Sequence, residues 1–181
     1  MKITIMSIML GIATVSFSQL KDLKGTWKSE KTENLGDGTF ATRVFVYNDN
    51  KWELNFILYL DSLKSKPVFN FKGVGTFKIE SKSKIVEGAS NAIFYFDKKY
   101  LTALTDNPEI LKNFGFVGLQ KNKETDITEN GLSFFPSKAK YGQEYDLVSL
   151  KGSKLYLGAR SNDLSSEDKR PKSLGNALIK K

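Results

Sequence analysis

The sequence predicts an all-β fold: an antiparallel β-barrel or half-barrel of about seven or eight strands with one short helix. The first observation behind this prediction is a period-two alternation of apolar and polar residues that runs from Gly25 onward and is typical of strands with one buried face. The second is that clusters of Gly, Asn and Asp interrupt the alternation, as tight turns between antiparallel strands require.

The first strands are expected at residues 25–31, 40–47 and 51–60. The third of these has the clearest alternation, and its apolar face consists of Trp52, Leu54, Phe56, Leu58 and Leu60. Residues 48–50 read Asn-Asp-Asn, a cluster that tolerates positive φ. The second and third strands should therefore pair as a hairpin.

The next strand is expected at residues 69–79, where three phenylalanines share one face. Gly73 and Gly75 lie between them, and two glycines in one strand indicate a bend or a close backbone approach, as at a barrel corner. The remaining strands are expected at residues 84–96, 145–150, 155–160 and 177–179, with a turn at 151–153 joining the second and third of these.

One short helix is expected after Asn107, which is a good N-cap, because Pro108 suits the first helical position and Gly115 can end the helix. Ile110 and Phe114 lie one turn apart and should face inward. Such a helix can cover one end of a barrel. Residues 120–131 and 161–173 are expected to be polar loops.

Residues 1–18 read as an export signal, because Lys2 precedes a mostly apolar stretch that ends in small residues before Gln19. We expect cleavage after Ser18 and a single barrel domain over residues 19–181, located outside the cytoplasm as a secreted or periplasmic protein. No stretch of the sequence is long and apolar enough to predict a membrane-spanning helix.

Cysteine and histidine are both absent, which excludes disulfides, thiolate nucleophiles, histidine general bases and ordinary zinc sites. We therefore expect no cofactor, no metal, no lipid-modified cysteine anchor and no enzymatic activity. A carboxylate-based hydrolase is the remaining catalytic alternative. Its acids would come from Glu30, Glu33, Asp61 and Glu87.

The formal net charge is +8, from 28 Lys and Arg against 20 Asp and Glu. The lysines are spread singly among acids and polar residues, which is typical of a solvated surface. A nucleic-acid partner is not expected, because binding would call for clustered basic residues interleaved with stacking aromatics.

Inward-facing aromatic residues can either fill a small barrel or line a cavity, and the alternation leaves both open. The opening Gly25-Thr26-Trp27 resembles the start of lipocalin-type ligand carriers. This resemblance implies a barrel that is lipocalin-like in general architecture, and it favours the cavity. The candidate pocket-lining residues are Val44, Trp52, Leu54, Phe56, Leu58, Phe69, Phe71, Phe77, Phe94, Phe96 and Phe114.

The only arginines are Arg43, Arg160 and Arg170. In a chain that uses lysine on its surface, an arginine is more often selected for its planar, multi-donor guanidinium. Because a barrel brings its first and last strands together, we expect Arg160 to pack over the indole ring of Trp27.

Taken in order, the motifs resemble the domain found twice in the animal adenomatosis polyposis coli down-regulated family of Wnt antagonists. The resemblance begins with Gly25, Trp27 and Ser29, followed by Glu33, and continues through Thr42-Arg43, Trp52 and Tyr59-Leu60-Asp61. Later matches are Pro67 and Phe69, residues 73–77, 87–88, 126–128 and 145–147. The most specific stretch is at residues 155–160, followed by Asp163, Ser165, Ser166, Asp168, Arg170 and Pro171.

The resemblance implies a β-barrel whose pocket holds a lipid group, with Gly25, Trp27, Arg43, Asp61, Arg160 and Arg170 as structural motif positions. Where that family has cysteines, this chain has Thr32 and Lys64, so the bridge that the resemblance would imply is missing. The expected function is therefore binding of an apolar small molecule, a lipid or acyl chain. An alternative is a filled barrel that binds another protein of the cell envelope.

Overall fold

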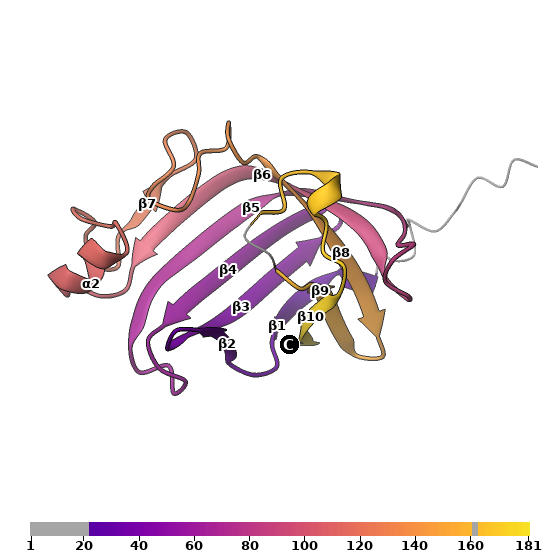
Figure 1. Ribbon diagram of the computed structural model, residues 1–181, viewed down its shortest axis with the longest axis horizontal. Coiled ribbons are helices and arrows are strands. Elements are labelled where there is room, and N and C mark those ends of the chain that lie inside the picture. Colours follow the sequence, from indigo (N-terminus) through magenta and orange to yellow (C-terminus); the bar gives the residue numbers. More distant parts are fainter. Residues whose placement is uncertain (1–21, 161–162) are drawn as a thin grey trace, which may run out of the picture.

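The computed structural model describes residues 22–160 and 163–181, so the predicted export signal at residues 1–18 lies outside the described residues (Figure 1). One antiparallel sheet dominates. Its strands are β1 (Gly25–Ser29), β2 (Glu33–Gly36), β3 (Thr39–Asn48), β4 (Lys51–Tyr59), β5 (Pro67–Lys82), β6 (Ser90–Ala103), β7 (Glu124–Asp126), β8 (Gln143–Lys151), β9 (Lys154–Gly158) and β10 (Leu174–Lys180). The helices are α2 (Pro108–Asn113) and a single 3-10 turn, η1 (Glu167–Lys169).

The sheet closes on itself because β1 pairs with both β10 and β3. Trp27 on β1 lies opposite Lys180 on one side and Phe45 on the other. The closed ring runs β1, β10, β9, β8, β6, β5, β4, β3, which makes an eight-stranded antiparallel barrel. This confirms the fold class that the alternation predicted.

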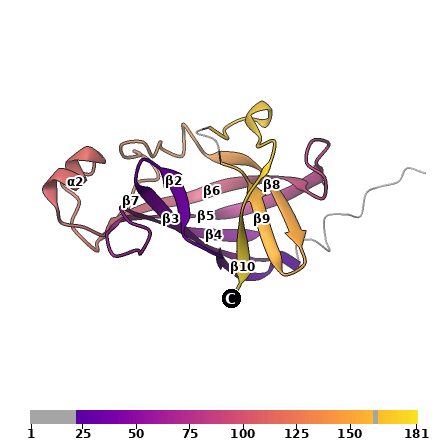
Figure 2. The same cartoon turned by 60° about the horizontal axis from the view of Figure 1, so that its bottom comes forward.

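The barrel has a closed half and an open half, because β3 to β6 are much longer than the strands that face them (Figures 1 and 2). β1 pairs with β3 only at residues 44–47, and β8 pairs with β6 only at residues 90–95. Beyond these points β2 and β7 take over the free edges of β3 and β6. α2 and the loops between β6 and β8 lie at this end of the barrel (Figure 1).

An aromatic cluster fills the closed half. Trp52 makes edge-on contacts with Phe94 and Phe96 at centroid distances of 5.4 and 5.1 Å, and Phe77 stacks on Phe94 at 5.7 Å. The indole Nε1 of Trp52 donates to the Thr76 and Tyr95 carbonyls at 3.0 and 3.1 Å, which satisfies its one buried donor. This half is a packed core.

The local predictions hold at both hairpins and at the helix. Asp49, with φ of 55°, turns β3 into β4, and Gly152, with φ of 59°, turns β8 into β9. The Asn107 side chain accepts from two backbone N–H groups at the start of α2, while Gly115 follows the helix at φ of 70°. The expected strand at 84–96 is wrong in its bounds: β6 begins at Ser90 and continues to Ala103.

A β-bulge in β6 changes which side chains face inward. Val74 on β5 lies opposite Lys98, but its neighbour Gly75 lies opposite Phe96, so Asp97 is an extra residue. Before the bulge the even-numbered Phe94 and Phe96 are buried; after it the odd-numbered residues are. The bulge therefore turns Lys99 into the interior.

Glycine is required opposite the bulge. A Cβ at Gly75 would lie 1.8 Å from the Tyr95 carbonyl oxygen, so no side chain fits there. Gly73 has a related role, since a Cβ there would lie 2.7 Å from the Phe96 ring. The two glycines predicted to mark a close approach do so by admitting backbone at one position and an aromatic ring at the other.

We predict that Gly75→Ala lowers the free energy of unfolding by more than about 2 kcal/mol, because the bulge must be rebuilt to admit the methyl group. The neighbouring Thr76→Ala, on the half-buried outer face, should cost less than about 1 kcal/mol. Urea denaturation of both variants tests this, and equal midpoints would contradict the proposed role of Gly75.

Candidate functional site

A cavity of about 840 Å³ lies in the open half of the barrel and opens to solvent on one side. Its floor is the inner face of β3 to β6, and its walls come from β2, the C-cap of α2, residues 134–141, β8 and the described residues that follow β9. The lining residues are Leu35, Arg43, Leu54, Phe56, Leu58, Phe69, Phe71, Phe96, Lys99, Phe114, Phe134, Phe135, Pro136, Lys140, Tyr141, Glu144, Arg160, Asp163 and Ser165.

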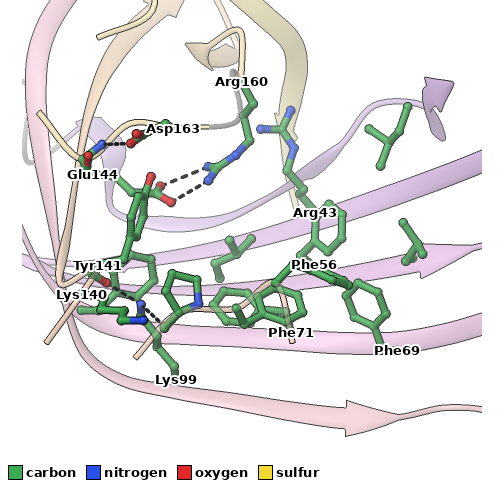
Figure 3. Close-up of a pocket in the computed structure, with 18 of the residues that line it drawn as sticks. Arg43, Phe56, Phe69, Phe71, Lys99, Lys140, Tyr141, Glu144, Arg160 and Asp163 are labelled. Atoms are coloured by element: carbon green, nitrogen blue, oxygen red, sulfur yellow. Dashed lines mark hydrogen bonds and ion pairs between the residues drawn. The ribbon is translucent and has the colours of Figure 1, made fainter. Parts of the chain in front are cut away.

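One side of this cavity is aromatic. Phe56, Phe69 and Phe71 project from β4 and β5 (Figure 3). Phe135 stacks on Phe71 with ring planes 2° apart and centroids 4.7 Å apart, and it meets Phe69 edge-on at 5.5 Å. Phe56 packs against the core but remains only partly buried, because its ring also borders the cavity.

The loop side of the aromatic wall is shaped by a tight turn. Leu132 and Phe135 exchange backbone hydrogen bonds of 2.8 and 2.9 Å, with Ser133 at φ of 53° between them. This places Phe134 at the tip of the turn, where it is 56% exposed. Gly115 lets the end of α2 approach this turn, since a Cβ there would lie 2.6 Å from the Ser133 hydroxyl.

The other side of the cavity is charged. The Arg160 guanidinium donates to both oxygens of the buried Glu144 carboxylate, at 3.1 and 2.6 Å. The buried Arg43 donates through Nε to Glu33 at 2.8 Å. Asp163 accepts from Lys169 at 2.5 Å. Each acid on this wall is thus paired with a base, and Figure 3 shows Arg43, Glu144 and Arg160 on the side away from Phe69.

Lys99 lies inside the pocket and is only 2% exposed. Its ammonium donates to the Pro136 carbonyl at 3.0 Å and to the Tyr141 carbonyl, and it lies 4.6 Å from the centroid of the Phe96 ring. Burial lowers the pKa of Lys99 from 10.5 to about 8, although Glu144 acts in the opposite direction.

The structure brings together most of the residues predicted to line a pocket. Those that border the cavity are Leu54, Phe56, Leu58, Phe69, Phe71, Phe96 and Phe114. Trp52, Phe77 and Phe94 instead belong to the packed core of the closed half. The placement of Val44 was wrong: it follows Arg43 on β3, and the pleat turns it to the outer face opposite Asn55.

Several pocket residues were missed by sequence reasoning. Phe134 and Phe135 fall in a segment without periodicity. Lys99 looked like one more surface lysine, yet the sequence carried a signal: the apolar alternation changes from even to odd numbers between Phe96 and Leu101. Such a change of phase is what a bulge produces.

The remaining motif residues do not line the pocket. Asp61 caps the loop between β4 and β5 by accepting hydrogen bonds from the Ser65 amide and hydroxyl, both at 3.0 Å. The hydrogen bond from the Ser65 amide is the main reason why the pKa of Asp61 is lowered. Arg170 donates to the Ala92 and Asp146 carbonyls at 2.7 and 2.6 Å. Gly25 adopts φ of 124°, in a region that favours glycine.

The predicted contact between Arg160 and Trp27 is wrong. The cation over the Trp27 ring is Lys180, at 5.3 Å from its centroid, and the indole Nε1 donates to the Leu23 carbonyl at 2.7 Å. Arg160 is held instead by Glu144. The first and last strands do meet, but the neighbour of β1 is β10 rather than the end of β9.

The acids considered for catalysis are dispersed or already paired. Glu30 pairs with Lys154 at 2.7 Å, Glu33 pairs with Arg43, and Asp61 lies in its loop. Within residues 22–160 and 163–181, no three of the His, Cys, Asp and Glu side chains are arranged to hold a metal ion. The same part of the chain contains no helix with the length and apolar character needed to cross a membrane.

Comparison with known proteins bears on this barrel directly. The family model described as Adenomatosis polyposis coli down-regulated 1 matches residues 5–114, more than half of the chain. This protein belongs to that family. The matched range ends just after α2, so it includes the closing strand β1, the long strands β3 to β6 and the apolar floor of the pocket.

The structure shows the contacts of several motif residues within the matched residues 5–114. Arg43 and Glu33, both within the match, form the buried ion pair on the charged wall. Gly73 and Gly75 admit the Phe96 ring and the β6 bulge. The charged partners Glu144 and Arg160, and the aromatic loop at 132–136, lie beyond the matched residues of this member of the adenomatosis polyposis coli down-regulated family.

We predict that Lys99 makes stability depend on pH between about 8 and about 10.5. Within this window the unfolded chain binds more protons than the folded one, so the free energy of unfolding rises with pH. The gain of the wild type relative to Lys99→Met should approach about 3 kcal/mol across the window. Denaturant titrations at several pH values measure it.

Lys98→Met is the matched control. Asp126 raises the pKa of the exposed Lys98 through a hydrogen bond, so any contribution from this neighbour has the opposite sign. Exposed pairs contribute little. A difference between the wild type and Lys99→Met that stays constant across the window would show that Lys99 is not desolvated.

Proposed function

We propose that this protein binds an apolar ligand, a lipid or acyl chain, in the open half of its barrel and acts as a binding protein rather than an enzyme. The observation that carries the proposal is the cavity of about 840 Å³ with a continuous wall of phenylalanines. Ligand pockets usually span about 300–1,000 Å³ and are mostly apolar with a few placed polar groups. The partly buried Phe56 and exposed Phe134 leave apolar surface that a ligand would cover.

We further propose that the protein works outside the cytoplasm, as a secreted or periplasmic protein. The apolar N-terminal stretch supports this proposal. The sequence has no cysteine, so no disulfide can form within it in that compartment, and stability must come from packing such as the aromatic cluster of the closed half.

A protein partner is the second candidate. Leu35 and Phe134, which both line the cavity, are 50% and 56% exposed. Exposed apolar side chains at the rim of a pocket can contact a partner's surface or a lipidated segment of it. Both a partner's surface and a lipidated segment of it would contact the same aromatic wall.

The first test is direct. Purified protein should carry lipid that native mass spectrometry and solvent extraction detect, and delipidated protein should bind a fluorescent fatty acid. Protein without bound lipid and without affinity for such probes would contradict the proposal.

We predict that Phe56→Glu weakens binding of the probe at least about tenfold, because it places a carboxylate against the chain of the ligand. Ile57→Glu is the control: the adjacent residue is equally half-buried but points to the outer face of β4. Fluorescence titration compares the two. Equal loss in both variants would move the binding site away from the cavity.

A further inference from the structure

We propose that the ligand is an acyl chain with a single negative charge at one end, a long-chain carboxylate, and that Lys99 binds the charged end. This inference rests on the proposed function, because it assigns the chemistry of the ligand in the same pocket. It is carried by three features: the charge balance of the pocket wall, the donors of the Lys99 ammonium, and the position of Lys99 between the aromatic and charged walls.

The charges that line the cavity do not cancel. The lining cations are Arg43, Lys99, Lys140 and Arg160, and the lining anions are Glu144 and Asp163. Both anions are already paired, with Arg160 and Lys169, and Arg43 is paired with Glu33. Lys99 has no ion pair with any described residue. It is therefore the one buried cation on this wall whose charge is not balanced by a carboxylate.

The ammonium of Lys99 still has binding capacity. It has three donors, of which two are used by the carbonyls of Pro136 and Tyr141. Carbonyls and the adjacent faces of Phe96 and Tyr141 stabilise a cation without cancelling its charge. One donor and one unit of positive charge remain, which is what a carboxylate would use.

The position of Lys99 matches an amphipathic ligand. On one side it touches the ring of Phe96, which continues into Phe71 at a centroid distance of 6.4 Å and from there into the aromatic wall. On the other side are Tyr141 and the pair of Glu144 and Arg160 (Figure 3). A chain lying on the phenylalanines would bring its polar end to the ammonium.

The arginines are less suited to bind the charged end. Both terminal nitrogens of Arg160 already donate to Glu144. If Arg160 turned to a ligand, the buried Glu144 carboxylate would lose this partner. Arg43 is fixed by Glu33 through Nε. Since only one buried charge among the described lining residues is unbalanced, a monoanion matches the pocket better than a doubly charged phosphate.

Protonation is consistent with this assignment. With a pKa of about 8, Lys99 is mostly charged at neutral pH. A bound carboxylate would raise that pKa again, since an opposite charge favours the protonated amine. The ligand would thereby offset the desolvation that burial imposes on Lys99.

The test compares ligands that share one chain and differ at the end: laurate, methyl laurate and dodecylammonium. Isothermal titration calorimetry of the wild type should show laurate binding about tenfold or more tightly than the ester, as expected for a charge-assisted hydrogen bond, and the amine most weakly. Equal affinity for laurate and the ester would overturn the inference while leaving the proposed function intact. Failure of the wild type to bind any of the three would overturn both.

Two variants locate the effect. Lys99→Met should abolish the preference, so that laurate and methyl laurate bind with about equal affinity. Lys98→Met removes the same charge one residue away and should preserve the preference for laurate. A preference for laurate that survives in Lys99→Met would overturn the role of Lys99. If Lys99→Met does not fold, the comparison of acid, ester and amine in the wild type still decides whether the pocket selects an anion.

Discussion

The bulge between β5 and β6 is the constraint on which the rest of the pocket depends. A strand has a side-chain period of two, so one extra residue moves every later side chain to the opposite face. Here that shift ends the aromatic run at Phe96 and brings Lys99 inside. It also coincides with the change of partner on β6, from β8 to β7, where the closed barrel gives way to the open half. Gly75 permits all of this by having no side chain.

The two halves of the barrel have different physical tasks. In the closed half the ring of strands and the cluster around Trp52 and Phe94 exclude solvent and supply the core. In the open half the same strands present Phe56, Phe69 and Phe71 to a cavity that loops cover only in part. A domain without disulfides can leave one end unfilled because the other end is packed.

Period-two alternation predicted much of the fold, because strand faces and hairpin turns are local properties. The turns at Asp49 and Gly152 and the caps of α2 follow from residue types a few positions apart. The site was harder to predict. Val44 was assigned to the inner face of its strand, but it lies on the outer face, next to the inward-facing Arg43. Phe134 and Phe135 reach the pocket through a loop whose course depends on tertiary contacts. Arg160 pairs with Glu144 and not with the Trp27 ring because β10 lies between β9 and β1, and this strand order could not be predicted from local sequence.

The bonds from Lys99 to the Pro136 and Tyr141 carbonyls also make it a noncovalent cross-link between the barrel floor and the segment that covers it. Thr128 adds a second tie, since its hydroxyl accepts from the Lys99 amide at 3.0 Å and its carbonyl accepts from Lys138 at 2.7 Å. A ligand on the remaining donor would bind to the same ammonium that holds these two carbonyls. Occupancy of the cavity and attachment of its cover are thereby thermodynamically linked, so that a change in one must change the other.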